Sequence, residues 1–340
     1  MKRIIVLFDA SAPTASDHDF REELKDKDEY ETEADVIAAL KRLGHETRLL
    51  ALYDSLVPLM QVIEEWKPDL VFNLMVAFRM DRAHEPHVVG ALELLGVPYT
   101  GANPTALTLC KDKALAKKIL DFHRIKTPRF VVSTRARPLR RVANMKSPLF
   151  VKPLSSEGSE GITLGALCDD EKSALERVAF LHESQQTDVV VEEFVDGREL
   201  YAGVLGDKRL QVLPLIELFV GHGPIGAEEM PDGAPRFFTF KAKWDRAYRK
   251  KWGISSGPAH ELPEATVTKI AQITRRVCRV LRIRSHGRLD LRLTPGGDVY
   301  VIEANPNPSL AATDELALAA KLAGIEFDEL VSRIVQYAGA

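Results

Sequence analysis

Cysteine is scarce in this chain, and long hydrophobic runs are missing. The three cysteines, Cys110, Cys168 and Cys278, are odd in number and far apart, which indicates neither a disulfide framework nor a zinc site. No segment reaches the roughly 20 apolar residues that a membrane span needs. The apolar start of the chain is too short for a signal peptide, because Asp9 ends it. These absences predict a reduced, cytoplasmic protein without a membrane segment.

Positive charge is not in excess either. The net charge of −3 argues against a nucleic-acid-binding surface spread over the whole protein. We therefore expect small-molecule substrates, with neither nucleic acid nor membrane as a partner, and leave a homodimer open. At 340 residues the chain exceeds the usual size of a single core, so two or three subdomains are expected.

The order of the predicted elements divides the chain into three parts. Strands and helices alternate in residues 1–108, which predicts a parallel sheet with ligands at the carboxyl ends of its strands. Residues 109–188 are expected to form a small central domain, and residues 189–340 a C-terminal α+β domain. Strands are expected at 4–8, 46–52, 69–74, 98–101, 129–133, 149–153, 163–167, 188–195, 199–206 and 209–218. Helices are expected at 33–43, 86–95, 104–122, 264–281 and, with a break at Gly324, 314–338.

Two long polar segments interrupt this pattern. Residues 9–32 are acidic, and they are either a solvated loop or a lid or substrate loop. Residues 219–262 are rich in glycine, proline and charge and are too long for a plain connector, so they indicate an active-site loop.

A predicted hairpin between Gly287 and Pro308 carries the most informative pattern, with its turn at Gly296-Gly297. The expected pairs are Thr294 with Val299, Arg292 with Val301, Asp290 with Glu303, and Arg288 with Asn305. Two carboxylates directly opposite each other should repel, so removing either charge should raise stability when no metal is bound. A divalent cation explains the pair, because Mg²⁺ prefers carboxylate and other oxygen ligands. An exposed face of mixed charge is the alternative.

Two further segments have the composition of a nucleotide site. A strand ending at Lys152 precedes the small residues of 155–161, whose free N–H groups suit phosphate oxygens, although many such turns bind nothing. The strand of 189–195 suits an adenine edge through its backbone, and Glu199 beyond it suits a ribose. A buried strand leaving the core through charged residues is the alternative for this second segment.

The order of these segments closely resembles the ATP-grasp superfamily, within it the D-alanine–D-alanine ligase branch. Nearly the whole chain takes part, including residues 92–107, Lys113 and residues 319–335. The resemblance implies a three-domain ATP-grasp fold, with an N-terminal parallel α/β domain, a small central lid domain and a C-terminal α+β domain. It implies ATP between the last two domains.

The resemblance also implies roles for single residues. The implied cofactor-binding residues are Lys113, Lys152, Glu157, Gly158, Ser159, Glu192, Glu193, Phe194, Val195, Glu199 and Lys243. The implied ligands of two Mg²⁺ ions, with Mn²⁺ as an alternative, are Asp290, Glu303 and Asn305. The implied catalytic residues are Arg288, Lys243 and Ser159, and the implied substrate contacts are Arg288, Ser309 and Asp314.

The chemistry implied is carboxylate–amine ligation through an acyl phosphate, with release of ADP and phosphate. The residues expected to bind the two substrates depart from the family pattern. The N-terminal glutamate that binds the amine of the first substrate is missing, and Asp314 stands where a serine is expected to bind the carboxylate of the second. An anion at Asp314 disfavours a substrate carboxylate there. We therefore expect substrates other than two D-alanines, and an amine without an adjacent free carboxylate. A scaffold protein without activity and a small-molecule kinase are the alternatives.

Overall fold

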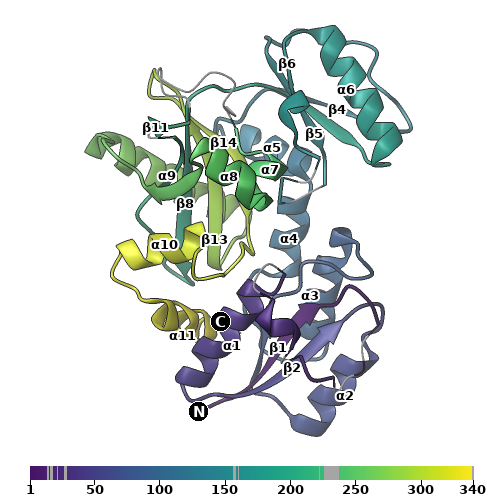
Figure 1. The fold of residues 1–340 in the computed structure, drawn as a ribbon, viewed down its shortest axis with the longest axis vertical. Helices are drawn as coiled ribbons and strands as arrows, with labels where there is room; N and C mark the ends of the chain where they lie inside the picture. The colour runs from purple at the N-terminus through teal and green to yellow at the C-terminus, as the bar shows by residue number, and fades with distance from the viewer. Residues whose placement is uncertain are drawn as a thin grey trace.

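In the computed structural model the described residues form three β-sheets, one for each predicted part of the chain (Figure 1). It describes residues 1–340 except 14, 16, 17, 21, 27, 28, 156, 157, 160, 222, 226–236, 339 and 340. No helix among the described residues has the length and apolar character required to span a membrane.

The N-terminal sheet is parallel, as predicted, with strand order β2-β1-β3. Its strands are β1 (Arg3–Asp9), β2 (Glu46–Leu52) and β3 (Leu70–Asn73), and its helices are α1 (Glu31–Arg42), α2 (Val57–Trp66) and α3 (Glu85–Leu94), with short 3-10 turns at Glu23–Lys25 and Arg82–His84. The strand expected at 98–101 is reduced to a single bridge between Val71 and Tyr99. The carboxyl ends of β1 and β3 place Asp9 and Asn73 at one edge of this sheet.

The central domain is an antiparallel sheet of order β4-β7-β5-β6 with one helix on it. Its elements are β4 (Phe130–Ser133), β5 (Leu149–Pro153), β6 (Leu167–Cys168), α6 (Glu171–Ser184) and β7 (Val189–Glu193). Instead of the strand expected at 163–167, the chain forms a 3-10 turn at Leu164–Ala166 before β6. Because β7 pairs with β4 and β5, this sheet extends past residue 188 to Glu193.

The C-terminal sheet is the largest, and β8 and β13 form its centre. Its strands are β8 (Arg198–Gly206), β9 (Gln211–Val212), β10 (Ile216–Val220), β11 (Gly223–Pro224), β12 (Ser255–Pro258), β13 (Ser285–Leu293) and β14 (Val299–Asn305). The helices that follow residue 237 are α7 (Phe240–Trp244), α8 (Arg246–Trp252), α9 (Glu264–Val280), α10 (Glu315–Leu322) and α11 (Phe327–Gln336).

The helix expected at 104–122 is two helices, α4 (Pro104–Lys111) and α5 (Lys113–Phe122). Asp112 separates them with an extended backbone, and its carboxylate accepts a hydrogen bond from the Leu115 amide at 2.9 Å, so it caps α5. Ala116 and Leu120 of α5 pack into the core of the C-terminal domain. The second helix therefore belongs to the C-terminal domain rather than to the central one.

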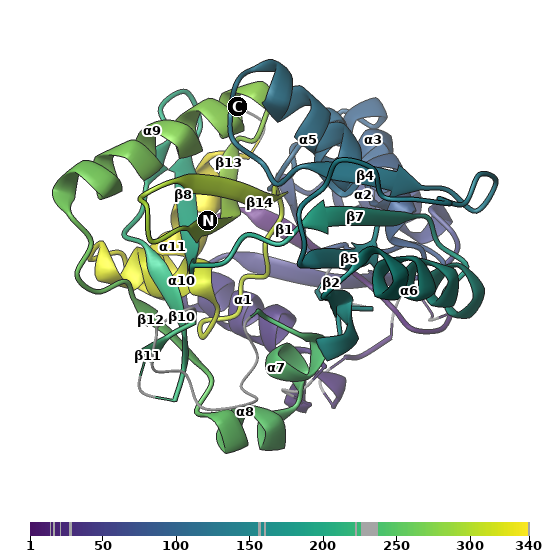
Figure 2. The ribbon, with the colours of Figure 1, turned by 90° about the horizontal axis from the view of Figure 1, so that it is seen from above.

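The N-terminal and C-terminal domains share one buried hydrophobic cluster in addition to a cluster of their own, whereas the central domain has only a cluster of its own. Ile4 and Leu40 pack in the same buried cluster as Leu316 and Ile334. The central cluster is separate and is built around Val151. Figure 2 shows β4, β5, β7 and α6 lying to one side of the C-terminal sheet. The molecule is thus a two-domain body with a separately packed lid.

A polar contact strengthens the junction of the two-domain body. Asn307 accepts a hydrogen bond from the Ala102 amide at 2.9 Å and donates one to Glu85 at 3.1 Å. Gly101 has a φ of 92°, and a Cβ there would overlap the Asn307 side chain. Glycine is required at this position because the two domains approach so closely.

The hairpin register differs from the prediction on one side of a β-bulge. Asp290 pairs with Glu303 and Arg288 with Asn305, as expected, but Arg292 pairs with Tyr300 rather than Val301. Thr294 faces Asp298 through a backbone hydrogen bond of 2.9 Å, which is also one residue off. The extra residue is Ile302. It lets Val301 enter the core while Glu303 faces the site, which strict alternation forbids.

Candidate functional site

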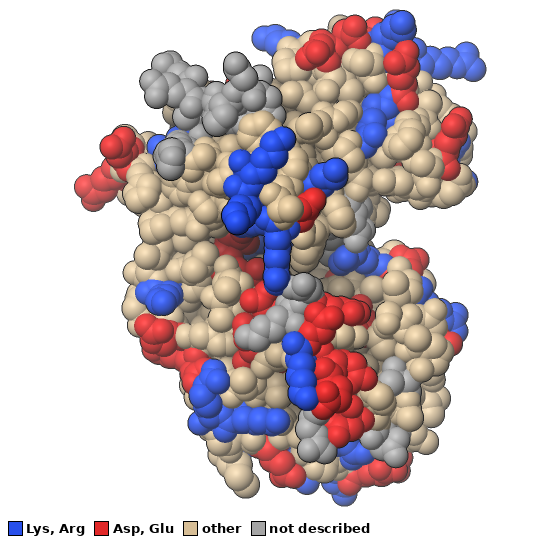
Figure 3. Space-filling view, viewed as in Figure 1, with Lys and Arg blue, Asp and Glu red and all other residues tan. Residues whose placement is uncertain are grey.

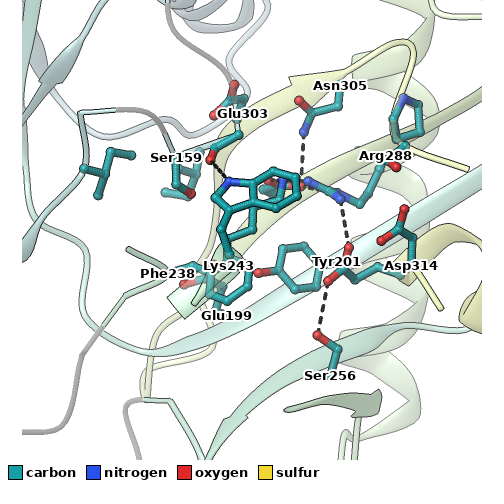
Figure 4. Close-up of a pocket in the computed structure, with 18 of the residues that line it drawn as sticks. Ser159, Glu199, Tyr201, Phe238, Lys243, Ser256, Arg288, Glu303, Asn305 and Asp314 are labelled. Carbon is teal, nitrogen blue, oxygen red and sulfur yellow. Dashed lines mark hydrogen bonds and ion pairs between the residues drawn. The ribbon is translucent and has the colours of Figure 1, made fainter. Parts of the chain in front are cut away.

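A cavity of about 1030 Å³ lies where the three domains meet. It is lined by every predicted site residue that the structure describes: Lys113, Lys152, Gly158, Ser159, Glu192, Glu193, Phe194, Val195, Glu199, Lys243, Arg288, Asp290, Glu303, Asn305, Ser309 and Asp314. Glu157, also predicted, lies outside the described residues. Figure 4 shows Ser159, Lys243, Arg288, Glu303 and Asn305 around one space. Residues far apart in sequence, which the resemblance implied for one site, thus line one cavity.

The opposed carboxylates of the hairpin each lie beside a basic residue. Arg288 binds Asp290 with two hydrogen bonds, of 2.8 and 3.1 Å, and Lys113 lies 3.4 Å from Glu303. Burial raises the pKa of Asp290, and this effect is larger than the lowering of the pKa by the nearby Arg288. Burial also acts to raise the pKa of Glu303, but Lys113 and Lys152 lower it overall. The repulsion within the pair is therefore compensated by these cations.

The oxygen donors of this hairpin fit a hard divalent cation. Asp290 and Glu303 are adjacent in register, and the Asn305 amide nitrogen donates to Asp290 at 3.3 Å, which directs the amide oxygen elsewhere. Carboxylate and amide oxygens are suitable ligands for Mg²⁺. In the part of the chain that the structure describes, no group of three or more His, Cys, Asp or Glu side chains is arranged for a metal. Water and phosphate oxygens would have to complete such a site.

A buried ionic triad lies beneath the cavity. Glu192 is 3.3 Å from Lys117 through one oxygen and 3.3 Å from Lys152 through the other, and each of the three residues is 2% exposed. Lys117 also donates at 3.0 Å to the carbonyl of Ile302, the bulge residue of β14. Burial lowers the pKa of Lys117 to about 8. The triad links the lid strands β5 and β7 to the strand that carries Glu303.

An aromatic group and a second ion pair flank the triad. Phe150 packs against Phe194 and Phe237, with ring centroids 6.1 and 4.8 Å away. Glu199 accepts from Arg292 at 2.7 Å and from the Tyr201 hydroxyl at 2.9 Å. Flat apolar surface beside a hydrogen-bonded carboxylate suits a base and a sugar hydroxyl. The carboxylate of Glu193 accepts a hydrogen bond from the Lys146 amide at 2.9 Å.

The helix α7 contacts the small-residue loop of the lid. Trp244 donates through its indole nitrogen to the Gly158 carbonyl at 3.0 Å, and the Phe240 amide donates to the Ile162 carbonyl at 2.9 Å. Lys243, between these two contacts, lines the cavity. Burial and the neighbouring Arg288 lower the pKa of its ammonium group. The contacts hold the lid loop over the side of the cavity where Lys243 lies.

The opposite side of the cavity is closed by α1 and is acidic. Thr32 lies 2.9 Å from Ser309 between hydroxyls, Thr313 donates to Glu31 at 3.1 Å, and the Ala312 amide donates to Asp35 at 2.9 Å. Asp314 accepts from the Ala311 amide at 3.1 Å, and burial raises its pKa. Residues 9–32 were expected to be either a solvated loop or a lid or substrate loop. For the end of this segment the structure favours a substrate loop, because Glu29 and Glu31 line the cavity.

Sequence reasoning missed several residues of the site. Lys117 lies one helical turn after Lys113 on α5, a spacing that places both on one face. Tyr201 lies two residues after Glu199 on the same face of β8, and its ring lies 5.1 Å from the Arg288 guanidinium. Glu315, next to Asp314, binds Arg288 at 2.9 Å. The helical and strand periodicity of the sequence could have indicated Lys117 and Tyr201, whereas the contact of Glu315 with Arg288 is visible only in the fold.

Known proteins similar to this chain include D-alanine–D-alanine ligases. A family described as the D-ala D-ala ligase C-terminus matches residues 112–336. A D-alanine–D-alanine ligase of Bordetella petrii is 32% identical over 73% of this chain and 70% of that protein. An uncharacterised Sinorhizobium fredii protein, y4sG, is 29% identical over 89% of this chain and 86% of that protein.

Solved structures have the same fold. The D-alanine–D-alanine ligase from Bacillus anthracis, complexed with ATP, superimposes with a TM-score of 0.73 at 23% identity, covering 99% of this chain and 97% of that one. The VanG D-Ala:D-Ser ligase from Enterococcus faecalis gives 0.68 at 20% identity, with 99% of both chains covered. At these identities the likeness concerns the fold alone.

Proposed function

The chain belongs to the D-alanine–D-alanine ligase family of the ATP-grasp superfamily and is an ATP-dependent C–N bond-forming ligase, and we propose that it joins a carboxylate to an amine that has no adjacent free carboxylate. The family assignment rests on the matched residues 112–336 and the B. petrii relative. The cavity supports the reaction, because it gathers the predicted cations and carboxylates. The substrate assignment rests on the acidic end of the same cavity.

We assign the nucleotide to the space between the lid and the C-terminal sheet. The aromatic group around Phe194 would hold the adenine, with backbone groups of β7 at its edge, since the side chain of Glu192 is directed to two lysines. Glu199 would bind the ribose. Lys113, Lys152 and the loop at Gly158 and Ser159 would face the phosphates.

The reaction is expected to proceed in two steps. A substrate carboxylate oxygen attacks the γ-phosphorus of ATP, and ADP leaves. The amine nitrogen then attacks the acyl carbon, loses a proton, and inorganic phosphate leaves as the amide forms. Arg288 and Lys243 stabilise charge on the transferring oxygens. Asp290, Glu303 and Asn305 would hold Mg²⁺, which when bound neutralises charge on the phosphates. The contact of Trp244 with Gly158 helps to exclude water from the acyl phosphate.

The loop at 309–314 supports an amine without a carboxylate. Its Ala311 and Ala312 amides already donate hydrogen bonds to the carboxylates of Asp314 and Asp35, so a substrate carboxylate there would have to compete with these two residues. The Ser309 hydroxyl is paired with Thr32. A further anion at this end would meet negative charge, whereas a cationic amine would be attracted.

An ADP-release assay tests the proposed function. Purified protein with Mg-ATP would be screened against pairs of amino acids, polyamines and small carboxylic acids. Release of ADP and phosphate that requires both partners is expected. Amine-independent ADP release with a stable phosphorylated product would indicate a kinase, and ATP binding without turnover a scaffold. Release of AMP and pyrophosphate, or efficient synthesis of D-alanyl-D-alanine, would contradict the proposal.

A further inference from the structure

Carboxylates gather on the N-terminal side of the cavity. Figure 3 shows Asp and Glu side chains concentrated on this domain beside the cleft. Glu29 and Glu33 line the cavity from the start of α1, and Asp9 ends the adjacent strand β1. Asp9 accepts a hydrogen bond from the Val76 amide at 3.0 Å, which fixes its carboxylate at the edge of the sheet.

Glu33 has no basic partner in the described part of the chain. No ion pair joins its carboxylate to a lysine or arginine there, although Arg82 lies near Asp9. Burial, together with the nearby Asp9 and Glu29, raises the pKa of Glu33 to about 7. A half-buried carboxylate beside like charges is unfavourable, and an added cation would relieve this.

A second, independent feature of the same edge is an unused hydrogen-bond donor. Asn73 ends β3, next to β1, lines the cavity and is 5% exposed. Its amide oxygen accepts from the Met75 amide at 3.3 Å, but its amide nitrogen has no hydrogen-bond partner among the described residues. A buried donor without a partner is costly unless a ligand supplies an acceptor.

We propose that Glu33, Asp9 and Asn73 form a subsite for a second cationic group of the substrate, an ammonium or guanidinium borne on a skeleton with a hydrogen-bond acceptor. The carboxylates would bind the cation, and the Asn73 amide would donate to the acceptor. The substrate class that follows is a basic amino acid, or a polyamine derivative with a carbonyl or hydroxyl group. This inference rests on the proposed function, because the subsite opens into the cavity assigned to ligation.

Binding measurements test the subsite independently of turnover. Calorimetry with the full-length protein and ADP would compare lysine and arginine with norleucine, which has a similar skeleton without the second charge. We expect the basic compounds to bind roughly tenfold tighter or more, the usual effect of a charge-assisted hydrogen bond. Glu33→Gln should abolish most of this preference, and Glu33→Asp should retain part of it. The affinity for ADP should be unchanged in both variants.

Glu22→Gln is the matched control, since Glu22 is an exposed residue of the same segment that pairs with Lys25 at 2.7 Å. Equal affinities for lysine and norleucine, or a preference that persists in Glu33→Gln with normal ADP binding, would overturn the subsite. If instead no carboxylate and amine pair releases ADP while the preference is found, the proposed reaction fails and the subsite stands.

Discussion

Asp290 and Glu303 face each other in register across β13 and β14, and each carboxylate lies beside its own basic residue, Arg288 for Asp290 and Lys113 for Glu303. Arg288 comes from the same strand as Asp290, whereas Lys113 reaches Glu303 from α5. In this way the chain neutralises the charge of the pair before any metal binds. A metal would have to compete with these two cations for the carboxylate oxygens.

Removing one of the two carboxylates should abolish turnover and lower stability. Asp290→Asn deprives Arg288 of a bidentate partner, so we expect a loss of about 2 kcal/mol in the free energy of unfolding, as for other hydrogen bonds to charged groups. This reverses the expectation based on repulsion alone, because the sequence did not reveal the basic partners. Urea unfolding in EDTA measures the effect, and a more stable Asp290→Asn protein would contradict it.

Lys117 is expected to stabilise the bulge of β14. In Lys117→Met the Ile302 carbonyl loses its donor at 3.0 Å, which should cost about 1–3 kcal/mol for a buried unsatisfied acceptor. A displaced Glu303 should also raise the Mg²⁺ concentration needed for half-maximal rate. Lys118→Met, at an exposed position of the same helix, is the control and should change neither quantity. Urea unfolding and a Mg²⁺ titration provide the measurements.

The protonation of Glu33 should make stability depend on pH. Its folded-state pKa, about 7, lies above the ordinary 4.5, so its contribution to stability is full below pH 4.5 and is lost as the pH rises through 7. Glu33→Gln removes this loss. Relative to wild type, the variant should gain about 2 kcal/mol between pH 5 and pH 8.5. A pH-independent difference in unfolding free energy would show that Glu33 titrates normally.

Trp244 should couple phosphoryl transfer to amide formation. Trp244→Phe keeps an aromatic ring but removes the N–H that donates to Gly158. A looser lid would admit water to the acyl phosphate, so ADP release without amide product should rise relative to wild type. The ratio of ADP to amide measures this. An unchanged ratio with normal folding would mean that the contact does not contribute to closure.

The parts of the fold that follow local rules were predicted from sequence. Alternation of strands and helices before residue 108 predicted the parallel sheet, and the strand at 149–153 has the expected bounds. The pairing of Asp290 with Glu303 was also predicted, although the turn is one residue shorter than expected and the bulge at Ile302 restores the register. Neither deviation has a sequence signal, because Ile302 is an ordinary strand residue.

The hairpin and lid residues that the resemblance implied for a site line one cavity, and their roles in binding and catalysis stay predictions. The residues that position them were not predicted, because their contacts join elements far apart in the chain. Lys117 meets Glu192 across 75 positions of sequence, and Thr32 meets Ser309 across 277. The periodicity of a sequence indicates which face of a helix is polar, but it does not indicate which residues of other elements will contact that face.

The core shared by the N-terminal and C-terminal domains has a kinetic consequence. Because these domains form one body and the lid has a separate core, opening the cavity means moving the lid away from that body. A compound seated against Asp9 and Glu33 would contact the N-terminal part of that body. Mutations that slow lid opening should then lower the turnover rate by delaying product departure, with the bond-forming step unchanged.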